Sequence, residues 1–156
     1  MNTVTFNVKS ALNTKEQKTL AERVLERVSK MTSLVISGEK DFSLIALEGA
    51  STQAFERFVT FEPMGNTSWI IPKRTLSHRV AKKQRLTTEE SAKLLRAAQI
   101  IALAEEVFNN SDKAHKWLDT PFSEFDNLTP NEYMKTEFGA SMIREALYRL
   151  HEGYFA

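Results

Sequence analysis

The sequence contains no cysteine, which excludes disulfide bridges, thiolate zinc sites and a cysteine nucleophile. This absence is typical of proteins in a reducing cytoplasm, where we expect this chain to be. No apolar run approaches the roughly 18 residues that a membrane-spanning helix needs. The N-terminus has no segment typical of a signal peptide. The sequence therefore predicts a protein without membrane contact.

Recognisable catalytic and metal-binding patterns are also missing. No glycine-rich phosphate loop and no Gly-x-Ser-x-Gly turn occurs. The 3 histidines, His78, His115 and His151, share no metal-ligand spacing. Glu89 and Glu90 are adjacent, so their carboxylates diverge on a helix. We therefore expect no catalytic residue, no metal site and no cofactor, and predict a binding protein rather than an enzyme.

Apolar residues recur at helical spacing through most of the chain, and capping signals precede several of these runs. The predicted helices cover about residues 14–30, 41–48, 72–84, 88–108 and 141–151, and shorter ones begin near Ser51, Ser111 and Thr129. The helix that begins at Thr129 is expected to end at Gly139. Val4, Phe6 and Val8 alternate with polar residues, which is compatible with a short strand that pairs with a second copy. The fold class is all-α.

One segment of the chain is strongly basic. Residues 63–88 carry six lysines and arginines and no acidic residue. Pro72 suits the first turn of the helix predicted over 72–84, whose apolar face carries Leu76 and Val80. A confined basic surface is typical of nucleic-acid binding, but a solvated helix face has the same composition. The candidate DNA-binding residues are Lys73, Arg74, His78, Arg79, Lys82, Lys83 and Arg85.

The C-terminal half carries short motifs in a fixed order. They are Ala114 to Pro121 (A-x-x-W-L-x-x-P), Thr129-Pro130, Thr136 to Ala140 (T-x-x-G-A) and Gly153 to Ala156 (G-x-x-A), preceded by Lys73 to Arg79 and Leu86 to Arg96. In this order and spacing the motifs resemble the Xre/MbcA/ParS-type antitoxins of RES–Xre toxin–antitoxin systems. The resemblance covers about residues 72–156, is poor over 40–71 and does not extend to 1–35.

The resemblance implies three segments. Residues 1–35 form an N-terminal extension with a helix, suited to dimerisation; residues 36–86 form an Xre-like helix-turn-helix domain; residues 87–156 form a long helix and a small helical toxin-binding domain. The first helix of the helix-turn-helix pair falls within residues 61–69. That stretch contains Pro63 and Gly65 and does not look like a regular helix, so the motif is degenerate.

The resemblance also implies a function. Such a protein is the antitoxin of a type II toxin–antitoxin module. It covers the active site of a RES-type, NAD-consuming or ADP-ribosyltransferase-like toxin, and represses its own operon by binding operator DNA, generally as a homodimer. The candidate toxin-binding residues are Phe122, Arg144, Tyr148, Arg149, Tyr154 and Phe155. Two alternatives stay open: a stand-alone helix-turn-helix regulator whose C-terminal domain only dimerises, and a scaffold without DNA contact.

Overall fold

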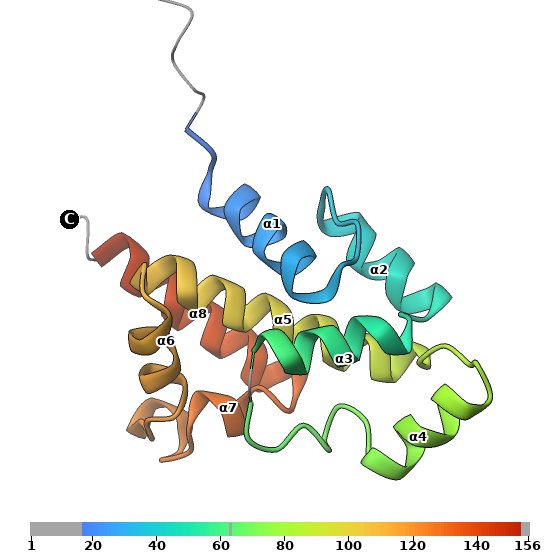
Figure 1. Cartoon of the computed structure of the whole chain (residues 1–156). Helices are drawn as coiled ribbons and strands as arrows, with labels where there is room; N and C mark the ends of the chain where they lie inside the picture. The colour runs from blue at the N-terminus through green and yellow to red at the C-terminus, as the bar shows by residue number, and fades with distance from the viewer. Residues whose placement is uncertain (1–16, 63, 154–156) are drawn as a thin grey trace, which may run out of the picture.

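Helices surround one central helix, α5 (Thr88–Phe108), in the computed structural model, which describes residues 17–62 and 64–153 (Figure 1). This described part has eight α-helices and no strand, which confirms the all-α prediction. None of its helices is long and apolar enough to cross a membrane. The other elements are α1 (Leu20–Thr32), α2 (Glu39–Glu48), α3 (Thr52–Phe61), α4 (Lys73–Ala81), α6 (Ser111–Leu118), the 3-10 helix η2 (Ser123–Phe125), α7 (Pro130–Tyr133) and α8 (Glu137–Gly153).

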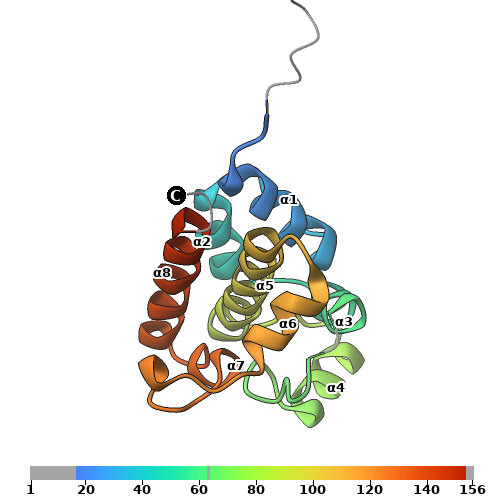
Figure 2. The same cartoon turned by 90° about the vertical axis from the view of Figure 1, so that its left-hand side faces the viewer.

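Helix α5 is buried on most of its circumference, as its apolar composition predicts. α1, α2, α6 and α8 all pack against it, and Figure 2 shows it running through the middle of the molecule. Small side chains let these neighbours approach closely; they are Ala97, Ala98, Ala102 and Ala104, all with no exposed area. The predicted capping box at its start is present, with Thr87 and Glu90 bonded to each other's backbone N–H. One continuous core therefore forms around α5.

Helix α1 begins later than the predicted residue 14. Thr19 is its N-cap and accepts a hydrogen bond from the Glu22 N–H at 3.2 Å. The Glu22 carboxylate accepts in return from the Thr19 N–H at 2.7 Å. This complete capping box satisfies two N–H groups and sets the helix start at Leu20. The competing signal at Thr14 lies outside the described residues.

The apolar face of α1 is buried by α5 and α3, through Val24, Val28 and Met31. The N-terminal helix therefore shares the common core. The strand predicted at Val4, Phe6 and Val8 lies outside the described residues, so pairing with a second copy through it stays a prediction.

The basic helix α4 is shorter than the predicted 72–84. Lys82 is its C-cap, and Lys83 has a φ of 53°, in the left-handed region that ends a helix. Leu86, only 2% exposed, is anchored in the core, and its N–H donates to the carbonyl of Ala50 at 2.9 Å. The chain has to leave the helix before Leu86 to reach this position, which explains the early end.

No regular helix links α3 to α4 among the described residues 62 and 64–72. This connection contains a single turn at residues 68–70, and Ile70 and Ile71 at its end are both buried. A standard helix-turn-helix joins its helices by about three or four residues, and this connection is longer. The irregularity that Pro63 and Gly65 predict is therefore present.

Helix α8 begins at Glu137 rather than at the predicted residue 141, and Gly139 lies inside it. Thr136 defines the start, because its Oγ1 accepts from the Gly139 N–H at 3.0 Å. A Cβ at position 139 would lie 1.8 Å from the carbonyl oxygen of Tyr133. The glycine therefore permits a close approach between α7 and α8. The sequence pattern predicted that Gly139 ends a helix, and this prediction was wrong.

Helix α6 is also capped by a different residue than predicted. Asn110, not Ser111, is the N-cap, and its Oδ1 accepts from the Lys113 N–H at 2.8 Å. Asn109 has a φ of 48° and ends α5. Ser111 is consequently the first residue of α6.

Candidate functional site

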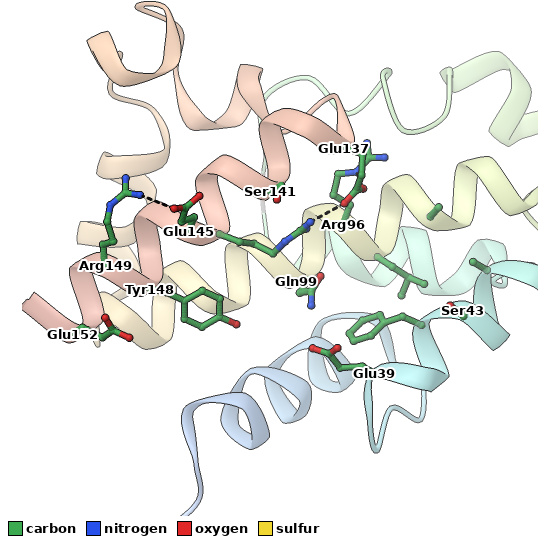
Figure 3. A pocket seen from close by; sticks show the side chains of 15 residues that line it. Glu39, Ser43, Arg96, Gln99, Glu137, Ser141, Glu145, Tyr148, Arg149 and Glu152 are labelled. Atoms are coloured by element: carbon green, nitrogen blue, oxygen red, sulfur yellow. Dashed lines mark hydrogen bonds and ion pairs between the residues drawn. The ribbon is translucent and has the colours of Figure 1, made fainter.

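A groove of about 850 Å³ runs between α2, α5 and α8 (Figure 3). Helix α8 lines one side with Arg144, Tyr148 and Arg149, three of the residues that the sequence singles out. Tyr148 is 47% exposed and extends from α8 into the groove. Because these residues share one face of α8, helical spacing alone places them together. The opposing wall on α2 comes from a segment far away in the sequence.

Ion pairs hold the charged side chains of the groove in place. Glu137 accepts from Arg96 at 2.9 Å and from Arg144 at 2.7 Å. Burial raises the pKa of Glu137, but the hydrogen bonds from these two arginines outweigh it and leave the pKa below its ordinary value. Arg149 pairs with Glu124 and, at 3.4 Å, with Glu145. An exposed aromatic ring flanked by oriented arginines is typical of a protein-binding surface.

Phe122 lies next to this surface but packs into an aromatic cluster. Its ring centroid is 5.5 Å from that of Trp117 and 6.0 Å from that of Phe125. A second cavity, of about 460 Å³, is lined by Trp117, Phe122 and Arg149 among others. The half-buried Phe122 therefore has a structural role, and its contact with a partner stays a prediction. Tyr154 and Phe155 lie outside the described residues.

The candidate DNA-binding residues lie on and just after α4, at the edge of the molecule (Figure 1). Most of them are exposed: Lys73, Arg74, His78, Lys82, Lys83 and Arg85. The helix has no fully buried residue, and Val80, expected on its inner face, is 44% exposed. α4 and the residues just after it therefore expose most of their basic side chains to solvent.

Two of these basic residues have partners within the chain. Arg79 donates two hydrogen bonds to Glu90, at 2.8 and 2.9 Å. Burial raises the pKa of Glu90, but the bonds from Arg79 and Thr87 outweigh it and keep the pKa below its ordinary value. Arg85 donates to the carbonyl of Gly49 at 2.9 Å. These two arginines position α4 against its neighbours, whereas Lys73, Arg74, Lys82 and Lys83 are exposed.

A cluster that the sequence did not indicate lies inside the molecule. Glu62 after α3, Glu105 on α5 and His115 on α6 place one donor atom each within 4.8 Å of one another. Burial, together with the nearby Glu105 carboxylate, raises the pKa of Glu62 to about 7, although His115 acts in the opposite direction. The three residues lie on different elements, so no spacing motif in the sequence predicts that they meet.

Comparison with known proteins bears on the C-terminal half. Residues 103–153 match the model of a family described as the antitoxin Xre/MbcA/ParS C-terminal toxin-binding domain. Residues 103–153 are thus similar to the C-terminal toxin-binding domain of this family. The resemblance carried by the sequence motifs is thereby confirmed. The matched segment runs from the second half of α5 to the end of α8, so it includes Arg144, Tyr148 and Arg149.

Curated relatives of this chain carry the name Antitoxin Xre. The protein from Pseudomonas putida is 44% identical over 85 residues, which cover 54% of each chain. Those from Yersinia enterocolitica and Photorhabdus laumondii are 31% and 30% identical, covering 55% and 51% of this chain and 59% and 55% of their own. The chain thus spans about half the length of the curated relatives it matches. About half of the chain is therefore similar to proteins that carry the name Antitoxin Xre.

Proposed function

We propose that this chain is the antitoxin of a type II toxin–antitoxin module in the cytoplasm and neutralises a RES-type, NAD-consuming or ADP-ribosyltransferase-like toxin by covering its active site. The observation that carries the proposal is that the segment of the toxin-binding family forms the α8 wall of the groove. The chain acts by binding and not by catalysis. The name of the relatives, Antitoxin Xre, and the surface chemistry of α8 both support this role.

The outer face of α8 has the composition of a binding surface. Tyr148 provides an aromatic ring, and Arg144 and Arg149 provide planar guanidinium groups already oriented by glutamates. Tyrosine and arginine are enriched among residues that dominate binding energies. Side chains held by ion pairs lose less conformational freedom when a partner arrives. We therefore place the toxin contact on α8 and the rim of the groove.

The second activity that we propose is repression of the operon through DNA binding by α4. Its exposed lysines and Arg74 can neutralise phosphates, and the release of counterions from DNA then drives binding. A homodimer matches the twofold symmetry of typical operators. The long connection before α4 departs from a standard helix-turn-helix, so we expect phosphate contacts to dominate over base contacts.

The toxin contact is tested by co-expressing the chain with the product of the adjacent gene. We expect the wild type to relieve growth arrest and the double variant Tyr148→Ala/Arg149→Glu to lose this relief. Loss of two dominant contacts corresponds to a Kd weakened about 100-fold or more. Lys116→Glu, an exposed charge reversal on α6 in the same family segment, is the matched control and retains neutralisation. Full neutralisation by the double variant would place the toxin contact elsewhere.

The DNA contact is tested with the operon's own promoter fragment. Lys82→Glu/Lys83→Glu should abolish binding without affecting folding or toxin binding, and Lys116→Glu should leave binding unchanged. For the wild type, a plot of log affinity against log salt concentration should be steep. Each phosphate contact should add about −0.9 to its slope. Binding that is insensitive to salt and to these reversals would exclude α4 as the DNA-binding element.

A stand-alone regulator whose C-terminal domain only dimerises is the alternative. It predicts that no partner co-purifies, that the adjacent gene product is harmless, and that Tyr148→Ala/Arg149→Glu gives a monomer. The antitoxin proposal predicts the opposite for all three, because the variant then loses the toxin and keeps its own oligomeric state. Size-exclusion chromatography with light scattering separates the two.

A further inference from the structure

Three helices bring metal-ligating atoms together in the interior, away from the groove and from α4. Glu62 follows the last residue of α3, Glu105 lies on α5 and His115 on α6. The His115 Nε2 is 2.8 Å from the Glu62 Oε2 and 3.4 Å from the Glu105 Oε1. Both glutamates are only 4% exposed. Fully buried carboxylates are rare unless they are paired or bind a metal ion.

Two arginines of α1 pair with glutamates of α5 beside this cluster. Arg27 bonds to the Glu105 Oε2 and to the Glu106 Oε1, both at 2.8 Å, and Arg23 bonds to the Glu106 Oε2 at 3.0 Å. These two arginines therefore face Glu105 and Glu106, whereas Glu62 lies beside His115 and the Glu105 carboxylate. Among the described residues, no arginine or lysine pairs with Glu62. Negative charge is costly to bury, so either a proton or a bound cation has to compensate Glu62.

We propose that Glu62, Glu105 and His115 bind a zinc ion. A tetrahedral zinc with ligand bonds of about 2.0–2.1 Å holds its donor atoms about 3.3 Å apart. The two donor separations at His115 lie on either side of this value, at 2.8 and 3.4 Å. The donor atoms of Glu62 and Glu105 also lie within 4.8 Å of one another, so rotation of the two carboxylates can bring all three atoms around one ion. The imidazole nitrogen favours zinc over magnesium or calcium, which prefer oxygen ligands alone.

The surroundings suit such a site. Arg27 holds one oxygen of Glu105 and leaves the other directed at His115, which fixes the orientation of this ligand. The Ser111 hydroxyl lies 3.4 Å from the same inward oxygen. The side chain of His115 is 28% exposed, so an ion and a completing water molecule can reach the cluster from solvent. The bound ion would join the end of α3 to α5 and α6.

Zinc binding is measured on the full, tag-free chain after treatment with a chelator, by isothermal titration calorimetry and by thermal unfolding. We expect one equivalent of Zn²⁺ to bind. At free zinc about 100 times its Kd, the Tm should rise by roughly 5–10 °C, because the ion binds only the folded state. Mg²⁺ at the same concentration should give no rise.

The variants Glu62→Gln and His115→Gln keep similar side-chain volumes and should each lose the zinc-dependent rise in Tm. His78→Gln, on exposed α4, is the matched control and should keep it. Circular dichroism tests whether each variant folds. If only one of the two folds, that variant alone is compared with the wild type. The proposal is overturned if 100 µM Zn²⁺ neither binds nor raises the Tm, if both variants respond like the wild type, or if Mg²⁺ acts equally. The cluster would then be neutralised by a proton on its own groups.

Discussion

Replacing Gly139 by alanine tests the close approach between α7 and α8. The new Cβ would lie 1.8 Å from the carbonyl oxygen of Tyr133 and 2.8 Å from its carbonyl carbon. Because ordinary contacts begin near 3.4 Å, this backbone carbonyl would have to retreat by about 1.5 Å. Backbone cannot yield as a flexible side chain does. We expect a loss of about 3 kcal/mol, at the upper end of the usual cost of overpacking.

For a chain of this size, such a loss lowers the Tm by roughly 6–12 °C. Thermal unfolding followed by circular dichroism measures it. Gly153→Ala, at the end of the same helix, is the matched control, since nothing lies within 4 Å of its added Cβ. The control should stay within about 1 kcal/mol of the wild type. The reasoning would be refuted by a Gly139→Ala protein whose Tm is within about 2 °C of the wild type.

Three further predictions concern stability. Leu103→Ala empties a site that is 1% exposed and should cost about 3 kcal/mol in urea unfolding, whereas Leu44→Ala, at a residue that is 56% exposed, should cost under about 0.5 kcal/mol. Glu90→Gln should destabilise at pH 7. Since the folded pKa of Glu90 is lowered, this gap should close as the pH falls below the ordinary value of 4.5, and a constant gap would contradict the ion pair. Thr129→Ala removes the cap of α7 and should cost about 1 kcal/mol, and an unchanged urea midpoint would contradict its capping role.

Local signals predicted most helices correctly because they act within a few residues. The central helix 88–108 has the predicted bounds, since its capping box and its apolar residues are both local features. Gly49 ends α2 as predicted, with a φ of 86° that favours glycine. Thr129 caps the helix at Pro130 with the predicted glutamate. Such signals depend on neighbouring backbone groups, which the sequence shows directly.

The other boundaries were changed by a contact between distant segments or by local caps that the sequence pattern did not single out. α4 ends early because Leu86 is anchored beside Ala50, and that hydrogen bond joins residues far apart in the chain. α8 starts early because Thr136 provides a cap where the pattern around Gly139 suggested an end. A glycine needed for close packing and a glycine that ends a helix look identical in sequence. Only the position of the Tyr133 carbonyl distinguishes them.

For the candidate sites as well, the sequence predicted some features and the tertiary structure decided others. The motifs from Ala114 onward were sufficient to identify the family, and helical spacing placed Arg144, Tyr148 and Arg149 on one face of α8. The groove that they line required α2 to fold back beside α8. The segmentation at residues 35 and 86 stays a prediction. The helices on either side of residue 35, α1 and α2, both pack on α5.

The sequence by itself determined the helical class, most helix starts and the relationship to the Xre/MbcA/ParS family, because periodicity, caps and motifs are properties of short stretches. The tertiary structure decided which face of α8 borders a groove, which arginines beside α4 are engaged, and that Glu62, Glu105 and His115 meet. These depend on packing around α5, where residues without a common motif are brought within bonding distance.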